Sequence, residues 1–152
     1  MSSERAFITR EGGDFSMPVP SCNVLLIAPR FTALSFWSWS HACEATGVGY
    51  PTAPLGLITV AALLPKSWSV RLVDRNIEDY ANADLDWADM VMTGGMLPQQ
   101  PDMLELIRIC RGRGKPIVVG GADPTSSPHL YDAPEATIKS SKILYSMVQL
   151  AV

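Results

Sequence analysis

Short apolar runs recur along the chain at the spacing of buried strands. The run 23–28, Asn-Val-Leu-Leu-Ile-Ala, is almost wholly apolar and is closed by Pro29. Such a run is typical of a strand that is covered on both faces of a sheet. Further runs predict three more strands and a short fifth one, at 70–73, 89–92, 116–119 and 136–138.

Helical patterns occupy much of the chain between these runs. A helix is predicted at 55–64, where a proline on each side marks its start and its end. A second helix is predicted at 101–113, with its apolar side chains on one side and Gly114 as its C-cap. We also expect a helical turn at 41–45 and a closing helix at 143–152.

Strands that alternate with helices predict an α/β fold. We expect a flavodoxin-like (Rossmann-like) parallel sheet of four to five strands, with helices on both faces and right-handed crossovers. Ligands of such sheets bind outside the carboxyl ends of the strands, here at the loops after strands one, three and four. The polar segment 1–21 is interpreted as a flexible leader, and 22–152 as a single domain.

Glycine pairs follow two of the predicted strands, at Gly94-Gly95 and at Gly120-Gly121. Each pair alone is either a tight turn or a place where a ligand approaches the backbone, and two pairs at neighbouring strand ends favour a ligand slot. We expect a bulky residue at Gly94 or Gly120 to block the slot and leave the fold intact. The glycine fingerprints of dinucleotide and triphosphate sites do not occur in the sequence. The acidic pair of a phosphorylated receiver domain does not occur either.

Composition and charge exclude several classes of function. The 152 residues are 47% hydrophobic and 18% charged, as in a globular domain, and the net charge of −3 comes without a basic stripe for nucleic acid. The sequence shows no signal peptide and no apolar stretch long enough to span a membrane. The three cysteines are odd in number and widely spaced, which fits neither a disulfide framework nor a zinc site. We therefore predict a cytoplasmic protein.

The spacing of small residues is similar to that of cobalamin-binding domains of the methionine-synthase kind. Those domains carry Asp-x-His-x-x-Gly before the first helix, Ser-x-Leu after the third strand and Gly-Gly after the fourth. Here Gly56 matches the final glycine of the first motif, Thr93 matches the serine, and 120–121 is the glycine pair, with 26 residues between Thr93 and Gly120. Ala53 then stands in the place of the axial histidine, and Pro51 in that of the aspartate. The resemblance implies cobalamin in its base-off form, with its nucleotide tail in the slot and no axial histidine.

Longer motifs between residues 23 and 131 resemble one group, the N-terminal domain of cobalamin-dependent radical S-adenosylmethionine enzymes. Hopanoid methylases and the anaerobic magnesium-protoporphyrin ester cyclase belong to that class, and the group commonly lacks the axial histidine. The motifs are Pro29-Arg-Phe-Thr32, Ser35-Phe-Trp37, Tyr50-Pro-x-Ala-Pro-Leu-Gly-Leu-Ile-Thr-Val-Ala61, Leu72-Val-Asp-Arg-Asn76, Asp84-Leu-Asp-Trp-Ala-Asp89, Met92-Thr-Gly-Gly-Met-Leu-Pro-Gln-Gln100 and Gly120-Gly-x-Asp-Pro-Thr-Ser-Ser-Pro-His129.

The resemblance implies a cofactor site without catalytic residues or metal ligands of its own. The implied cobalamin-binding residues are Pro29, Arg30, Phe31, Ala53, Leu55, Gly56, Asp74, Thr93, Gly94, Gly95, Met96, Leu97, Gly120, Gly121, Ala122 and Asp123.

Two features of the radical enzymes do not occur in the sequence. Their Cys-x-x-x-Cys-x-x-Cys cluster motif is missing, and the segment 136–142 departs from the family's fifth strand. The chain therefore resembles the cobalamin half of a larger enzyme, either a stand-alone protein or a truncated one, and we do not expect it to be catalytic alone. The implied partner is a radical, 4Fe–4S-binding domain, in trans or in a longer chain. The alternatives are a cobalamin sensor or carrier, and a flavodoxin-like module for another phosphate-containing ligand.

Several single residues have two interpretations. Trp37 and Trp39 lie in a long aromatic-rich loop and either cover the corrin ring or form a small core under the loop. The histidines, His41 and His129, are interpreted as solvated or locally bonded rather than as metal ligands. Asp74 either caps the turn after the second strand or binds a corrin amide.

Two of the three cysteines have a single, simpler interpretation. Cys43 and Cys110 are predicted to be small buried hydrophobic residues.

Overall fold

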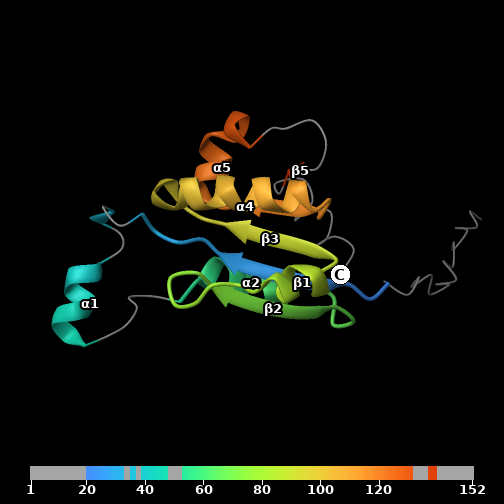
Figure 1. Ribbon diagram of the computed structural model, residues 1–152, viewed down its shortest axis with the longest axis horizontal. Helices are drawn as coiled ribbons and strands as arrows, with labels where there is room; N and C mark the ends of the chain where they lie inside the picture. The colour runs from blue at the N-terminus through green and yellow to red at the C-terminus, as the bar shows by residue number, and fades with distance from the viewer. Residues whose placement is uncertain (1–19, 33–34, 37–38, 48–52, 132–136, 140–152) are drawn as a thin grey trace, which may run out of the picture.

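The computed structural model describes residues 20–32, 35–36, 39–47, 53–131 and 137–139 (Figure 1). In this part of the chain, parallel strands form a single sheet in the order β2-β1-β3-β4-β5. This is the flavodoxin-like strand order, so the predicted fold class is confirmed. The strands are β1 (Asn23–Ala28), β2 (Ser69–Asp74), β3 (Met90–Gly94), β4 (Ile117–Gly120) and β5 (Thr137–Lys139).

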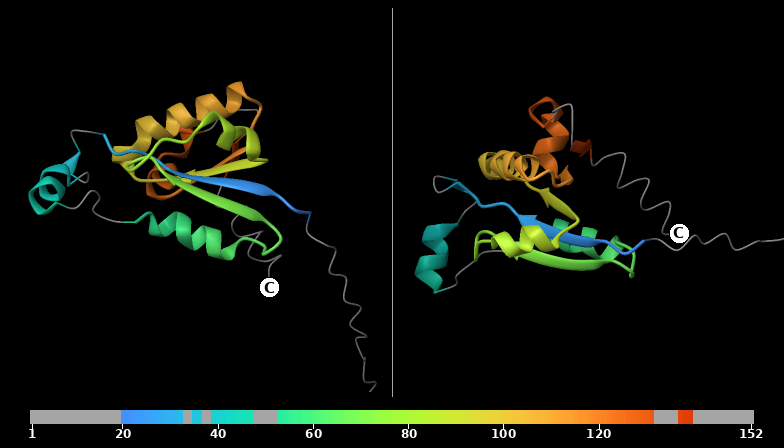
Figure 2. Two further views of the ribbon diagram at one scale, coloured as in Figure 1. Left: turned by 60° about the horizontal axis from the view of Figure 1, so that its bottom comes forward. Right: turned by 45° about the vertical axis from the view of Figure 1, so that its right-hand side comes forward.

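Helices cover both faces of the sheet, as Figure 2 shows for α2 and α4. The helices of the described residues are α1 (Ser40–Thr46), α2 (Leu55–Leu63), α3 (Asn82–Trp87), α4 (Gln100–Gly112) and α5 (Ala122–Ser126), with short 3-10 turns η2 (Leu97–Gln99) and η3 (Pro128–Leu130). Neither α3 nor α5 was predicted from the sequence pattern. Both are too short for an apolar repeat, and Leu85 is the buried residue of α3.

The alternation of side chains along β1 explains the two-sided core. Val24 and Leu26 face α2, in one cluster with Leu57 of that helix. Leu25 and Ile27 point to the opposite face and pack with apolar residues of α3 and α4. A strand that is buried on both faces has no polar positions to alternate with apolar ones, and this is why 23–28 is a continuous apolar run.

The observed elements differ from the predicted ones mainly at their ends. β3 and β4 extend as far as Gly94 and Gly120 because the two strands remain paired up to these glycines. The helix predicted from 101 begins one residue earlier as α4, and Arg113 is its C-cap, followed by Gly114 in the left-handed conformation.

Other predictions fall partly outside the described residues. The fifth strand is observed at Thr137–Lys139. The leader as far as residue 19, Trp37, Pro51, Ala136 and the closing helix at 143–152 lie outside the described residues. Within the described ranges, no helix combines the length and the apolar character needed to cross a membrane.

The cysteines differ in burial. Cys110 is fully buried in α4, as predicted, whereas Cys43 is only half-buried on α1. The prediction that Cys43 is buried is therefore wrong. The reason is that α1 extends away from the sheet beyond its carboxyl edge, where it has little to pack against (Figures 1 and 2).

Alkylation of the folded protein with iodoacetamide at about pH 8 should modify Cys43 and leave Cys110 unmodified. Burial raises the pKa of the Cys110 thiol to about 11, so little of the reactive thiolate forms there. Peptide mapping by mass spectrometry measures both sites in one sample. Modification of Cys110 at the rate of Cys43 would contradict the packing of α4 against the sheet.

Candidate functional site

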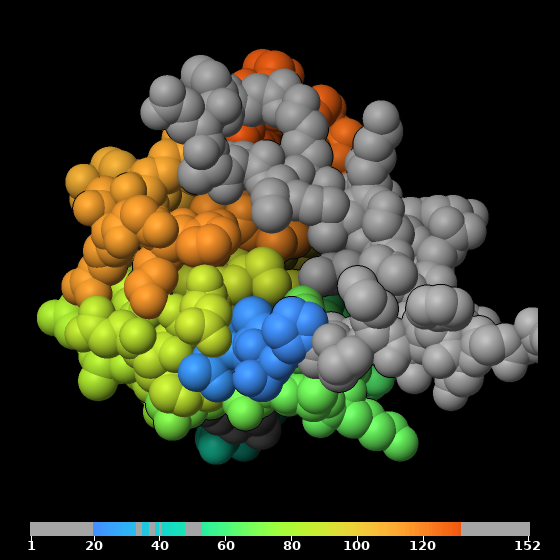
Figure 3. Space-filling view, turned by 90° about the vertical axis from the view of Figure 1, so that its right-hand side faces the viewer, coloured from blue at the N-terminus to red at the C-terminus, as the bar shows by residue number. Residues whose placement is uncertain are grey.

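A pocket with a volume of about 460 Å³ lies at the carboxyl ends of β1, β3 and β4, beside the start of α2. The chain leaves β1 toward β2 on one side and leaves β3 toward β4 on the other, so this is the topological switch point of the sheet. The arrowheads in Figure 1 point to this edge, and Figure 3 shows the opposite edge, where β1 (blue) begins.

Most of the residues implied by the resemblance line this pocket. They are Pro29, Phe31, Ala53, Leu55, Gly56, Thr93, Gly94, Gly95, Met96, Gly120, Gly121 and Ala122. Further residues that were not predicted from the sequence also line the pocket, namely Ala28, Pro54, Leu57, Val60, Met92, Gln99 and Val118. Apart from Pro54, which precedes α2, the missed apolar residues belong to buried strands and to α2, where a core position and a pocket position have the same sequence pattern.

The glycine pairs bring two strand ends into direct backbone contact. Gly95 N–H donates to the carbonyl of Gly120 (3.2 Å), and a Cβ placed on Gly94 would lie 2.8 Å from that same oxygen. Gly121 has a φ of +99°, and a Cβ there would lie 2.6 Å from backbone atoms of Gly95. The strands could not approach this closely with larger residues.

This contact corrects one prediction. A bulky residue at Gly94 cannot leave the fold intact, because its side chain would collide with backbone atoms of β4 rather than project into the pocket. For Gly120, the expected block of the slot remains a prediction.

Thr93 joins the two strands on either side of the switch point. Its hydroxyl is buried and donates to the Ile27 carbonyl of β1 (2.8 Å). Thr93 also lines the pocket, so the hydroxyl proton is occupied while the oxygen retains acceptor capacity.

Gln99 is a polar lining residue that was not predicted from the sequence. It is buried, its Nε2 donates to the Pro29 carbonyl (2.7 Å), and its Oε1 accepts from Met96 N–H (3.1 Å). It therefore connects the loop after β1 with the loop after β3. The motif 92–100 contains Gln99, but nothing in that motif shows which of the two adjacent glutamines faces the pocket.

Four of the implied residues do not line the pocket. The Arg30 side chain turns to Asp79 (2.8 Å), and Leu97 is 66% exposed. Asp74 accepts a hydrogen bond from the backbone N–H two residues later (2.9 Å), as expected of a residue that caps the turn after β2. Asp123 is buried in α5.

The carboxylate of Asp123 has protein partners. It accepts from Gln100 Nε2 (3.0 and 3.2 Å) and from the hydroxyl of Tyr131. Burial raises the pKa of Tyr131, and the hydrogen bond to Asp123 raises it further. Asp123 thus holds α5 and the segment after it to α4, beside the pocket rather than in it.

The pocket has an uncharged lining. Among the described residues that form it, Thr93 and Gln99 carry the polar side chains, and none is ionisable. Within the described part of the chain, no cluster of His, Cys, Asp and Glu has the arrangement of a metal site. His41 is 99% exposed on α1, with Glu44 at 3.9 Å. The pocket therefore suits an uncharged, largely apolar group that contacts backbone at the glycines.

Comparison with known proteins gives two curated relatives, while no family model matches the chain. Over 104 residues the chain is 44% identical to an uncharacterized methyltransferase of Synechocystis sp.. The matched stretch covers 68% of this chain and 19% of the relative. Over 112 residues it is 35% identical to the hopanoid C-2 methylase of Rhodopseudomonas palustris. This matched stretch covers 73% of this chain and 21% of the relative.

The chain is homologous to part of two longer proteins named as methylases. It spans about a fifth of the length of these relatives.

Proposed function

We propose that this chain is a cobalamin-binding domain of the kind found in radical S-adenosylmethionine methylases. The observation that carries the proposal is the pocket of small, uncharged residues at the switch point of a flavodoxin-like sheet. The homology to a hopanoid methylase adds support that is independent of the pocket.

The volume and the lining of the pocket support the nucleotide tail of cobalamin as its occupant. Its volume lies within the usual range for small-molecule sites, about 300–1,000 Å³. Dimethylbenzimidazole is a flat, largely apolar bicycle, and Leu57, Val60 and Val118 give the pocket apolar sides. Gly94 and Gly120 line the pocket at the sheet end without side chains, so the ribose and phosphate of the tail could approach the backbone closely there.

The lower face of cobalt would have no imidazole from this chain. Ala53, in the place of the axial histidine, lines the pocket and carries no nitrogen donor in its side chain. His41 lies on the exposed helix α1. We therefore propose base-off cobalamin, with its tail in the pocket and no axial histidine. When bound, the cobalt would supply the methyl-transfer chemistry.

The proposed partner is a radical, 4Fe–4S-binding domain, in trans or in a longer chain. The cysteines of this sequence do not form the cluster motif, and the relatives are about five times longer than the part that matches. Any methylated substrate would be recognised together with that domain.

Purified protein incubated with hydroxocobalamin and then desalted should be red or orange, with close to one cobalamin per chain by absorbance. A module for another phosphate-containing ligand would stay colourless, and that outcome would contradict the proposed function. A sensor or carrier without chemistry would also be coloured, and a neighbouring gene with the three-cysteine cluster motif would distinguish the proposed methylase module from it.

Electron paramagnetic resonance of the bound Co(II) form should show cobalt lines without triplet splitting. An axial nitrogen, whether from histidine or from dimethylbenzimidazole, would split each line into three. The His41→Ala variant should give the same spectrum as the parent, because His41 does not reach the metal in this proposal. A triplet that disappears in His41→Ala would show that the histidine is a ligand.

A further inference from the structure

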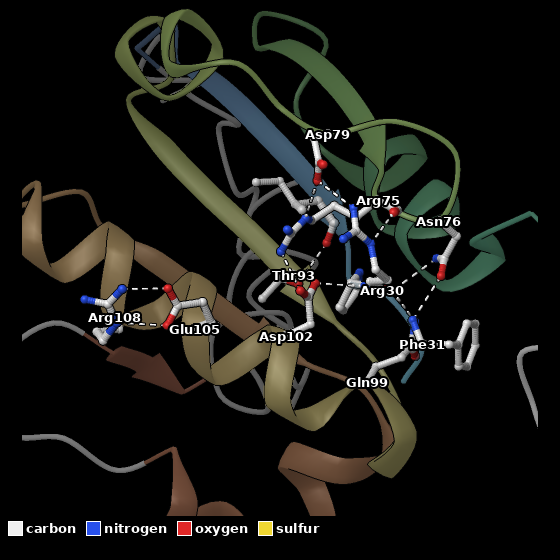
Figure 4. A network of polar contacts seen from close by, with 12 residues as sticks. Arg30, Phe31, Arg75, Asn76, Asp79, Thr93, Gln99, Asp102, Glu105 and Arg108 are labelled. Carbon is white, nitrogen blue, oxygen red and sulfur yellow. Dashed lines mark hydrogen bonds and ion pairs between the residues drawn. The ribbon is translucent and has the colours of Figure 1, made fainter. Parts of the chain in front are cut away.

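The loop after β1 is held by Gln99, which lines the pocket, and by Asn76, Asp102 and Arg75, which do not. Pro29 and Phe31 line the pocket but belong to neither a helix nor a strand. The Pro29 carbonyl accepts from Asn76 Nδ2 (3.1 Å) and from Gln99 Nε2 (2.7 Å), and Phe31 N–H donates to Asn76 Oδ1 (3.0 Å) (Figure 4). Buried backbone groups outside regular structure need such partners to keep a fixed position.

Asp102, in the first turn of α4, holds the middle of the same loop. Its Oδ2 accepts from Arg30 N–H (2.8 Å), and its Oδ1 accepts from Arg75 Nη1 (2.5 Å). In Figure 4 the carboxylate lies between the loop backbone and the arginine. Both arginines also donate to Asp79, at 2.8 and 3.2 Å, and these hydrogen bonds lower the pKa of that exposed carboxyl.

The ion pair of Arg75 with Asp102 differs from the other pairs nearby in its burial. Its two side chains are 14% and 18% exposed, whereas the partners of the Glu105–Arg108 pair on the same helix are 48% and 72% exposed. Exposed pairs are strongly screened and contribute little, but removing one partner of a buried pair leaves a charge without compensation. The Arg75–Asp102 pair is therefore the one with the larger influence on the loop.

We propose that Asp102, Arg75 and Asn76 are positioning residues that set the place of the loop 29–31 and thereby the affinity of the pocket for cobalamin. None of the three lines the pocket, so they act through the loop rather than by contact with the ligand. The effect on cobalamin affinity rests on the proposed function, whereas the effect on the position of the loop 29–31 does not.

The variants Asp102→Asn and Asn76→Asp test the network, with Glu105→Gln as the matched control. Asp102→Asn removes the charge that pairs with Arg75. Asn76→Asp replaces the amide donor by a carboxylate that faces the Pro29 carbonyl and Asp74. Glu105→Gln removes a carboxylate from an ion pair one turn away on α4 that touches no pocket loop.

Amide hydrogen exchange on the protein without ligand provides the first measurement. In both network variants, exchange at Arg30 and Phe31 should accelerate by about tenfold or more, while core amides of β3 and β4 keep the parent rates. The control should match the parent at every amide. Unchanged exchange at Arg30 and Phe31 in both variants would overturn the proposal.

Titration with hydroxocobalamin, followed by absorbance, provides the second measurement. The Kd should rise about five- to tenfold in each network variant and stay at the parent value in Glu105→Gln. Faster loop exchange with an unchanged Kd would show that the network is only structural and would overturn the statement about affinity. A parent that binds no cobalamin would refute the proposed function, while the exchange data would still decide whether the network holds the loop.

Discussion

The Gly56→Leu variant should lose cobalamin binding by at least about 100-fold while its fold remains as stable as that of the parent. Gly56 lies in the first turn of α2 and lines the pocket, and a Cβ built there meets no atom within 4 Å. A leucine therefore enters open space that the ligand would occupy. Replacing a helical glycine also gains up to about 1 kcal/mol in helix propensity.

Gly112→Leu is the matched control for this substitution. Gly112 is the last residue of α4, does not line the pocket, and likewise has no atom within 4 Å of a built Cβ. Its affinity for hydroxocobalamin and its melting temperature should stay close to those of the parent. If Gly56→Leu binds as tightly as Gly112→Leu, cobalamin does not occupy this pocket.

The Gly121→Ala variant should lose about 3 kcal/mol or more of its free energy of unfolding. Two causes combine at this residue. Its φ of +99° is unfavourable for alanine, and the added Cβ would lie 2.6 Å from the backbone nitrogen and oxygen of Gly95. Backbone atoms of a paired strand end cannot move aside as a flexible side chain can. Urea unfolding followed by circular dichroism measures the loss.

Gly114→Ala separates the two causes. Gly114 also has a positive φ, +62°, but a Cβ there meets nothing within 4 Å. This variant should lose only about 1 kcal/mol, the cost of the backbone conformation alone. Equal losses in Gly114→Ala and Gly121→Ala would mean that the close approach of β3 and β4 contributes nothing to the need for glycine.

These glycines thus have two roles that need different experiments. Gly94 and Gly121 are required by contact between the two strand ends, so their substitution reports on folding before it reports on a ligand. Gly56 is free of such contact and reports on the pocket. A loss of cobalamin binding in Gly121→Ala alone would therefore say little about the ligand site.

The sequence by itself determined the sheet and the edge at which the pocket lies. The first strand was predicted at 23–28 and is observed there, because a strand buried on both faces is encoded by a local run of apolar residues. Parallel strands place all their carboxyl ends at one edge of the sheet. The alternation of strands and helices therefore predicted that the loops after strands one, three and four lie together. The glycine pairs marked the same edge.

The tertiary structure alone decided which polar side chains face the pocket and which hold its walls. Gln99 faces the pocket while the adjacent Gln100 binds Asp123, a difference that depends on how η2 runs into α4. Arg30 was predicted to bind cofactor, but its backbone and side chain bond to groups 45 to 72 residues away. Hydrogen bonds over such separations leave no periodic trace in the sequence, because each depends on where two distant segments come to lie.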